Sequence, residues 1–159
     1  MILMNYGDLT IKGDSTLDGH DDWVQFDSVQ WGVGRAIAAT TGGGDRETSQ
    51  PSFSEITLTK FMDKSSIDLF IESCGGKKPY PTIIRWVNTS GDTNEVYHEL
   101  ELGNTLVTAY STSSGGDRPT ESITLNFTTI MVKYTRFAPD GTQEEISPKG
   151  WDLTLNKKL

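Results

Sequence analysis

The chain has 159 residues, and its 22 Asp and Glu residues outweigh 14 Lys and Arg residues to give a formal net charge of −8. A negative surface repels the phosphate backbone on which nucleic-acid affinity depends, so DNA and RNA are excluded as partners. No apolar run approaches the roughly 18 residues that a membrane helix requires, which argues against membrane insertion. Residues 1–8 lack the basic start and apolar centre of a signal peptide, so the sequence predicts synthesis in the cytosol.

The length of the chain suits a single domain over residues 1–159, built on one hydrophobic core. Cys74 is the only cysteine, so no internal disulfide can form. The fold is therefore not expected to depend on an oxidising compartment.

The first third of the chain contains two predicted strands, over residues 4–12 and 23–33, separated by a polar loop. In the second strand the apolar positions change parity near Asp27, which predicts a bend or bulge. The loop over residues 14–22 groups several carboxylates around His20. Metal sites and solvated turns share this composition, and the solvated turn is the favoured interpretation.

Residues 35–51 change character, because seventeen residues pass without a periodic pattern. Stretches of this kind inside a compact domain are commonly functional. The glycine run at 42–44 has neither the Gly-Lys-Ser/Thr of a P-loop nor the GxGxxG of a dinucleotide site. Two interpretations remain open: a surface excursion without a role, and an arm that touches another protein.

A third strand is predicted over residues 54–61, followed by a helix. Ile67, Phe70, Ile71 and Cys74 follow the helical spacing i, i+3, i+4, i+7. Ser65 and Asp68 form a capping-box-like pair at the start, and Gly75-Gly76 end the helix. We expect the apolar stripe to pack on the β-sheet, with Cys74 buried and unreactive.

The second half of the chain reads as strands joined by short turns. Strands are predicted over residues 79–87 and 95–102, with His98 among core residues as a hydrogen-bonded structural histidine. Gly103-Asn104 predicts a tight turn into a strand over 106–111.

The longest strand pattern covers residues 122–134, where the apolar parity changes at Thr128-Thr129. This change predicts a bulge, a bend or a new pairing partner. A last strand is predicted over 151–156. The whole pattern is mainly β and favours a barrel or a sandwich.

The chemistry-bearing residues do not assemble into a recognisable active site. A nucleophilic serine needs a base, and the two histidines are assigned to a loop and to the core. Carboxylates are plentiful enough to leave a paired-acid glycosidase open, but the four tryptophans lie in strand patterns where a core role is simpler. We therefore expect no enzymatic activity, no cofactor and no metal site.

A set of short motifs runs in order along the chain: GDS at 13–15, VQWGV at 29–33, ITLTK at 56–60, DKS at 63–65, GDRPTESITLNF at 116–127 and GW at 150–151. From residue 4 to residue 157, this set resembles Hcp, the tube protein family of the bacterial type VI secretion machine. The resemblance implies a β-barrel of two curved antiparallel sheets with one helix and a long extended loop.

The resemblance further implies homohexameric rings that stack into a hollow tube. Implied partners are other copies of the chain, a contractile sheath, a VgrG-type spike and effector cargo in the lumen. The tube would be built in the bacterial cytoplasm and then secreted or delivered into a target cell. The residues expected at the subunit or ring-stacking interface are Arg35, Thr41, Gly42, Gly43, Gly44, Asp45, Arg46 and Glu47. Those expected at the lumen are Gln30, Ser113 and Ser114.

An alternative function from a different class remains at this point. A monomeric β-sandwich could bind carbohydrate or peptide through exposed aromatic side chains. The four residues that such a platform would use are Trp23, Trp31, Trp86 and Trp151. Their burial therefore separates the two hypotheses.

Overall fold

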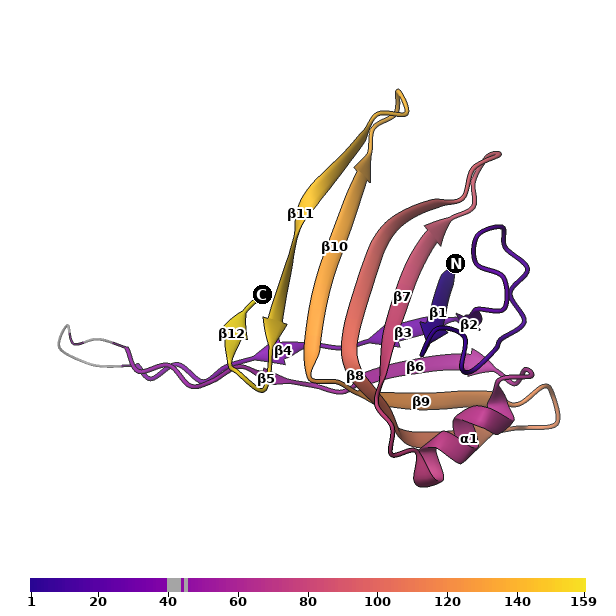
Figure 1. The fold of residues 1–159 in the computed structure, drawn as a ribbon, viewed down its shortest axis with the longest axis horizontal. Coiled ribbons are helices and arrows are strands. Elements are labelled where there is room, and N and C mark those ends of the chain that lie inside the picture. The colour runs from indigo at the N-terminus through magenta and orange to yellow at the C-terminus, as the bar shows by residue number, and fades with distance from the viewer. Residues whose placement is uncertain (40–43, 45) are drawn as a thin grey trace.

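The computed structural model describes residues 1–39, 44 and 46–159, which form two curved antiparallel sheets, a separate two-stranded ribbon and the helix α1 (Ser66–Gly75) (Figure 1). The strands are β1 (Ile2–Tyr6), β2 (Val24–Phe26), β3 (Ser28–Gln30), β4 (Val33–Gly34), β5 (Ser52–Phe53), β6 (Ile56–Phe61), β7 (Tyr80–Asn88), β8 (Glu95–Ser113), β9 (Thr120–Asn126), β10 (Thr129–Phe137), β11 (Gln143–Asp152) and β12 (Lys157–Lys158). Four of the residues predicted at an interface lie outside the described residues: Thr41, Gly42, Gly43 and Asp45.

One long strand, β8, belongs to both sheets. The large sheet has the order β12-β11-β10-β8-β7-β1-β2. The small sheet has the order β3-β6-β9-β8. The mainly-β composition, the helix and the two curved sheets confirm the predicted fold class. Among the described residues no pairing joins the outer strands of a sheet, so the sheets face each other without closing into a barrel.

The hydrophobic core lies between the two sheets. Alternation directs one side of each strand inward, so Leu58 and Leu125 of the small sheet meet Ile84 and Leu100 of the large one. All four side chains are fully buried. The hydroxyl of Tyr6 donates a 3.3 Å hydrogen bond to the carbonyl of Thr105, which satisfies its polar end inside this core.

The predicted turn at Gly103-Asn104 is wrong, because β8 runs through it for 19 residues. Asn104 has a positive φ of 50°, and the chain kinks there instead of reversing. Before the kink β8 pairs with β7 and β10; after it Thr105 still pairs with Tyr80 of β7, and residues from Leu106 onward pair with β9. The signal that suggested a turn therefore marks the passage from one sheet to the other.

Each predicted change of buried face proves to be a change of sheet. The segment over 122–134 is two strands, β9 in the small sheet and β10 in the large one. The segment over 23–33 likewise divides at Asp27 into β2, which pairs with β1, and β3, which pairs with β6. The predicted bend near Asp27 is confirmed, and a new pairing partner, rather than a bulge within one strand, explains Thr128-Thr129.

The predicted bounds of the first and last strands are wrong. β1 ends at Tyr6 because Asp8 and Leu9 adopt positive φ values of 53° and 62° in a turn. At the other end, β11 covers residues 143–152, and the carboxylate of Asp152 accepts 2.9 Å hydrogen bonds from the backbone N–H groups of Thr154 and Leu155. That side chain holds a turn where the alternation predicts a strand.

The predicted orientation of α1 is also wrong. Ile67, Phe70 and Ile71 are 67%, 46% and 58% exposed, and Cys74 is exposed as well. The buried side chains of α1 are Ser66 and Leu69. The helix therefore turns its apolar stripe outward and a narrow, partly polar face inward.

The start of α1 also differs from the prediction. The side chain of Ser65 makes no capping hydrogen bond to the helix, which rules out the expected pair with Asp68. Instead, the carboxylate of Asp63 accepts hydrogen bonds from the backbone N–H of Ser65 at 2.9 Å and from its hydroxyl at 2.5 Å. No helix within the described residues is long and apolar enough to cross a bilayer.

Candidate assembly surfaces

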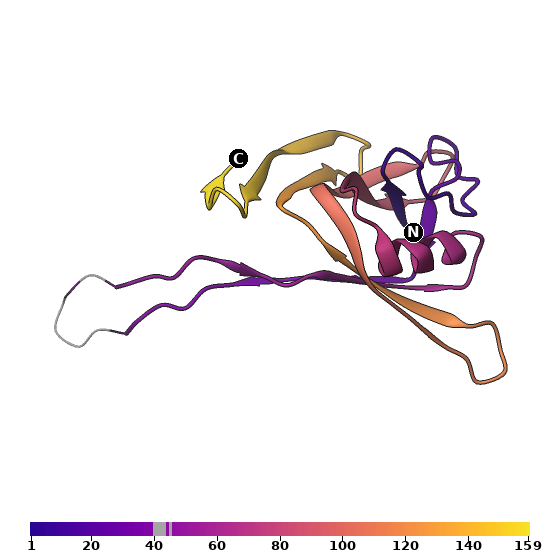
Figure 2. The same cartoon turned by 60° about the horizontal axis from the view of Figure 1, so that its bottom comes forward.

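The segment predicted as a long extended loop forms an arm that projects from the body of the molecule (Figures 1 and 2). We call the described residues 33–39, 44 and 46–53 the arm. Its base is the antiparallel pair β4–β5, and further out Ala38 N–H donates to the Glu47 carbonyl at 2.9 Å. The backbone thus supplies an extended ribbon where the side-chain pattern shows no period.

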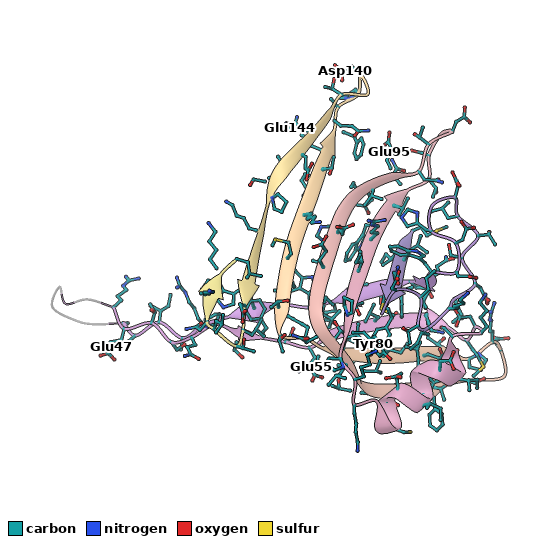
Figure 3. All side chains as sticks on the ribbon, viewed as in Figure 1. Glu47, Glu55, Tyr80, Glu95, Asp140 and Glu144 are labelled. Atoms are coloured by element: carbon teal, nitrogen blue, oxygen red, sulfur yellow. The ribbon has the colours of Figure 1, made fainter. Side chains whose placement is uncertain are left out.

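Serine side chains bond the two legs to each other, both just before the base of the arm and within it. The hydroxyl of Ser54 accepts from the Gly32 N–H at 2.8 Å, and that of Ser49 accepts from the Ala36 N–H at 2.8 Å. Arg35, Gly44, Arg46 and Glu47, the four described residues predicted at an interface, are all exposed. Figure 3 shows Glu47 far out on the arm, away from both sheets.

The outward face of the small sheet is rich in hydroxyl groups, and its strand residues are uncharged. Its register places Gln30 opposite Thr57, Thr57 opposite Thr124, and Thr124 opposite Ala109. We call this surface the hydroxyl face. Its members are Ser28, Gln30, Thr57, Thr59, Phe61, Ala109, Ser111, Ser113, Thr120, Ser122, Thr124 and Asn126. A carboxylate borders this face, because Glu55, immediately before β6, accepts hydrogen bonds from Asn126 at 3.3 Å and from Thr108 at 2.9 Å.

The predicted lumen residues lie on this side of the molecule but are not brought together. Gln30 is at one end of the hydroxyl face, opposite Thr57. Ser113 is at the other end, opposite Thr120, whose partner on β6 is Phe61. Ser114 lies in the following turn, where its hydroxyl donates to the Asp117 carbonyl at 2.9 Å.

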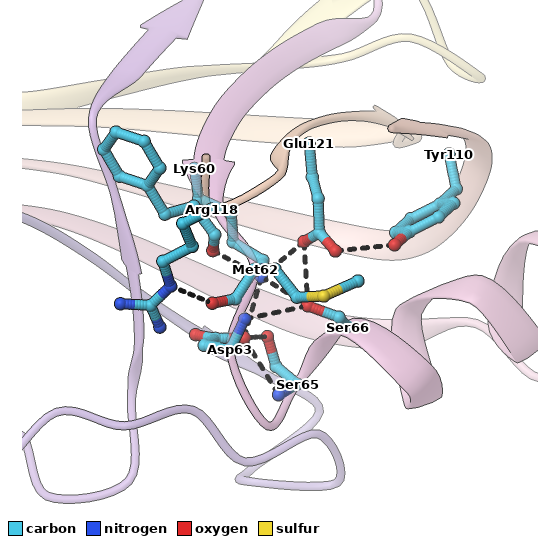
Figure 4. A network of polar contacts seen from close by, with 9 residues as sticks. Lys60, Met62, Asp63, Ser65, Ser66, Tyr110, Arg118 and Glu121 are labelled. Carbon is cyan, nitrogen blue, oxygen red and sulfur yellow. Dashed lines mark hydrogen bonds and ion pairs between the residues drawn. The ribbon is translucent and has the colours of Figure 1, made fainter. Parts of the chain in front are cut away.

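A buried ionic network connects the small sheet to α1, as Figure 4 shows. The Lys60 ammonium lies 2.7 Å from Asp63 and 2.6 Å from Glu121, and its side chain is 1% exposed. The hydroxyl of Ser66, on the first turn of α1, donates to Glu121 at 2.9 Å. Tyr110 on β8 donates to the other oxygen of Glu121 at 2.6 Å. Burial, and then this hydrogen bond, raises the pKa of Tyr110 to about 12.

The sequence analysis missed this network, although a signal for it exists. In β6, Lys60 has the parity of the core residues Ile56 and Leu58, and in β9 Glu121 has the parity of Ile123. A lysine and a glutamate on the inward parity of two strands indicate a buried pair, because either charge alone would be too costly to bury.

The outer side of the large sheet carries a row of ion pairs. Arg85 on β7 lies 2.5 Å from Glu99 on β8, and Lys133 on β10 lies 3.0 Å from the same carboxylate. Burial tends to raise the pKa of Glu99, but the hydrogen bonds from Arg85 and Lys133 outweigh it and lower that pKa. Arg85 also stacks over the Trp23 ring at 5.1 Å. The row is a structural crosslink between three strands.

Each histidine has a hydrogen-bond partner and packs against a tryptophan ring. The Nε2 atom of His20 accepts a 3.4 Å hydrogen bond from Arg85 Nη1, and its buried ring packs against Trp23. The Nδ1 atom of His98 lies 3.0 Å from the Lys133 carbonyl, and its ring packs on Trp86. The hydrogen bond predicted for His98 is confirmed, although its side chain is half-buried at the end of the core.

The tryptophans and carboxylates do not form a ligand platform. Trp23 is buried, and Trp31, Trp86 and Trp151 pack against the main core. Across residues 1–39, 44 and 46–159, no three His, Cys, Asp or Glu side chains come together as metal ligands. The candidate interaction surfaces of the molecule are therefore its arm, its hydroxyl face and its sheet edges.

Comparison with known proteins identifies the family. Residues 3–134 match the family model described as "Type VI secretion system effector, Hcp". Protein hcp1 of Pseudomonas aeruginosa is 35% identical over 106 residues, which cover 64% of this chain and 65% of that protein, slightly less than two thirds of its length. The solved structure of a type six secretion system protein is 25% identical, with a TM-score of 0.90 over 99% of this chain and 98% of the other.

A second solved structure, Hcp1 from Salmonella typhimurium, shares the fold with a TM-score of 0.78. The two chains are 20% identical, and the alignment covers 99% of this chain and 97% of the other.

Proposed function

This chain belongs to the Hcp family of type VI secretion proteins, and we propose that it is a structural subunit of the inner tube of that machine. Six copies would form a ring, rings would stack into a hollow tube, and the tube would be expelled with the spike. The observation that carries the proposal is the match to the family model over residues 3–134. The role is one of assembly, without catalysis or a cofactor.

The edges of the small sheet support ring formation. Among the described strands, the outer edges of β3 and of residues 106–113 of β8 pair with nothing. Because the four strands alternate in direction, β3 and β8 are antiparallel to each other. The β8 edge of one copy would therefore accept the β3 edge of the next with the same antiparallel geometry. Such a contact uses two different surfaces and is heterologous, as a closed ring requires.

The hydroxyl face supports a lumen role. In a ring closed through the small sheet, one side of that sheet faces the core of each subunit and the hydroxyl face is turned to the channel. Gln30, Ser113 and Ser114 would then line the lumen or its mouths. A wall made mostly of hydroxyl groups, with the Glu55 carboxylate at its border, offers hydrogen bonds to cargo proteins and selects them only weakly by charge. Effector carriage is therefore the role that we propose for this face.

The arm supports contact beyond the ring. It projects away from both sheets (Figure 2), so residues 35–47 would reach a neighbouring ring or subunit. We further propose that a VgrG-type spike caps the tube and that contractile sheath proteins surround it. Assembly would precede firing in the bacterial cytoplasm, and expulsion would deliver the tube to the target.

Native mass spectrometry and negative-stain electron microscopy of the purified chain test this function. Six-membered rings and stacked tubes are the expected result. Monomers alone at high protein concentration would contradict it. In a separate fluorescence titration of the same protein, a change in tryptophan emission on adding soluble glycans would instead favour the monomeric binding module.

A further inference from the structure

The apolar stripe of α1 is exposed, although one of its members, Phe70, touches Tyr110 at its edge. Ile67, Phe70, Ile71 and Cys74 follow one another along the outward side of the helix, and all four are exposed. Their spacing makes them one continuous surface rather than scattered apolar residues. Continuous exposed apolar surfaces on soluble proteins mark interaction sites.

The position of α1 directs this stripe toward a neighbouring copy. The helix lies beside β8, where the Phe70 ring packs edge-on against Tyr110 with centroids 6.0 Å apart. β8 is the free edge of the small sheet that ring formation would cover. The stripe therefore continues the surface proposed to meet the next subunits.

The arm carries a second set of apolar side chains without a partner. Val33 and Ile37 are 54% and 48% exposed, and Ala36, Ala38 and Ala39 beside them are exposed as well. A two-stranded ribbon has little stability of its own and gains it by packing against another surface. The arm and α1 lie at opposite ends of the molecule in both ribbon views (Figures 1 and 2), so they cannot meet within one chain.

From these observations we infer that the apolar stripe of α1 is covered by the arm of a second copy of this chain. Each copy has one arm and one stripe at opposite ends, so the contact is heterologous and propagates from copy to copy. The inference rests on the proposed function and deepens it, because it identifies the surface that receives the arm.

Charge complementarity supports the pairing of these two surfaces. Arg35 is exposed on the arm next to Ala36, and Asp68 is exposed on the flank of the stripe next to Ile67. Neither side chain takes part in an ion pair within the described part of the chain. Docking the arm on the stripe would give each of them an opposite charge at the border of an apolar contact.

Disulfide trapping tests this inference directly, since Cys74 is the only thiol of the chain. Ile37→Cys places a second thiol on the arm, and mild oxidation of assembled protein should link it to Cys74 of another copy. We expect a reducible ladder of covalent multimers on non-reducing gels. The matched control is Ile146→Cys, whose position on β11 is 44% exposed but belongs to neither surface.

The ladder should contain about tenfold more cross-linked chain than the control, because assembly holds the two thiols at a high effective concentration. Equal ladders from both variants, or no ladder from Ile37→Cys, would overturn the inference. Free reaction of Cys74 with maleimide in assembled wild-type tubes would also overturn it, since the stripe would then be open to another protein such as the sheath.

Charge reversal gives a second, independent test. Arg35→Asp and Asp68→Arg should each shorten the tubes, and the double variant should restore them. Negative-stain images of the same samples show whether rings and tubes form at all. Tubes without cross-links contradict only this inference, whereas the absence of rings contradicts the proposed function on which it rests.

Discussion

Lys60 and Glu121 face each other across the β6–β9 pair and form a 2.6 Å ion pair in which both side chains are buried. Asp63, Ser66 and Tyr110 complete the hydrogen bonding of the pair. The pair therefore fixes the start of α1 to the small sheet.

Removal of one partner should strongly destabilise the fold. Lys60→Met leaves two carboxylates without their cation in a buried site, and we expect a loss of about 3–5 kcal/mol in the free energy of unfolding. Urea denaturation measures it. Arg136→Met, which removes one side of the exposed pair with Glu144, is the control and should cost far less. Similar losses for the two variants would contradict the structural role of the buried network.

Stability should fall in mild acid because of His20. Burial lowers the pKa of His20 in the folded protein, and the nearby Arg85 guanidinium adds to the effect, partly offset by the Asp18 carbonyl and the carboxylates of Asp18 and Asp21. The unfolded chain therefore binds the proton more readily than the folded one. The stabilising contribution is present above the unfolded pKa, near 6.5, and is lost as the pH falls below it.

Unfolding free energies measured from pH 7.5 down to about pH 5.5 test this predicted loss of stability. His20→Gln keeps an acceptor for Arg85 but cannot titrate, so its stability should vary less over this range. An identical pH dependence in the wild type and the variant would remove His20 from the explanation.

Gly13 should not tolerate a side chain. A Cβ atom at this position would lie 2.4 Å from the Trp23 carbonyl oxygen and 2.4 Å from Val24 Cα, both of them backbone atoms. We expect Gly13→Ala to cost about 1–3 kcal/mol, the usual penalty for overpacking. Gly32→Ala meets no atom within 4 Å and is the control. Thermal melts of the two variants give the comparison.

The proposed direction of the hydroxyl face can be tested by labelling. In a Cys74→Ala background, Thr57→Cys should react with a small maleimide but not with a large PEG-maleimide once tubes have formed, because only the small reagent enters a narrow channel. Thr142→Cys, in the exposed β10–β11 turn, should react with both reagents. Equal reaction of the position-57 thiol with both reagents would place the face outside the tube.

Deletion of residues 42–46 should weaken ring stacking without unfolding the subunit. The described residues nearest this segment, 35–39 and 47–50, are exposed and contribute nothing to the core. Electron microscopy should show rings with few tubes, while circular dichroism and the unfolding midpoint stay close to those of the wild type. Tubes of unchanged length would refute the stacking role of the arm.

Alternation within strands was the most reliable guide to the fold, because burial on one side of a sheet imposes a period of two on the sequence. It located the central strands and the break at Asp27. It could not distinguish a bulge from a change of sheet at Thr128-Thr129, since both reverse the parity. Gly103-Asn104 was misinterpreted for a related reason, because a kink within a strand and a turn between strands use the same residue types.

The helix shows a second limit of sequence reasoning. The spacing of Ile67, Phe70, Ile71 and Cys74 identifies an apolar face, but not whether that face meets the chain's own core or another molecule. The inward side of the helix consists of Leu69 and the hydroxyl of Ser66. This hydroxyl can be buried because it donates a hydrogen bond to Glu121, 55 residues away in the sequence. The arm was located by the absence of any period, and its backbone pairing had no side-chain signal.

The length of β8 has a mechanical consequence. Its first half is bonded to β7 and β10 and its second half to β9, along one continuous backbone. A force along this strand loads both ladders in shear, so many hydrogen bonds must break together rather than one after another. A force applied to the small sheet would therefore reach the large sheet along one continuous backbone.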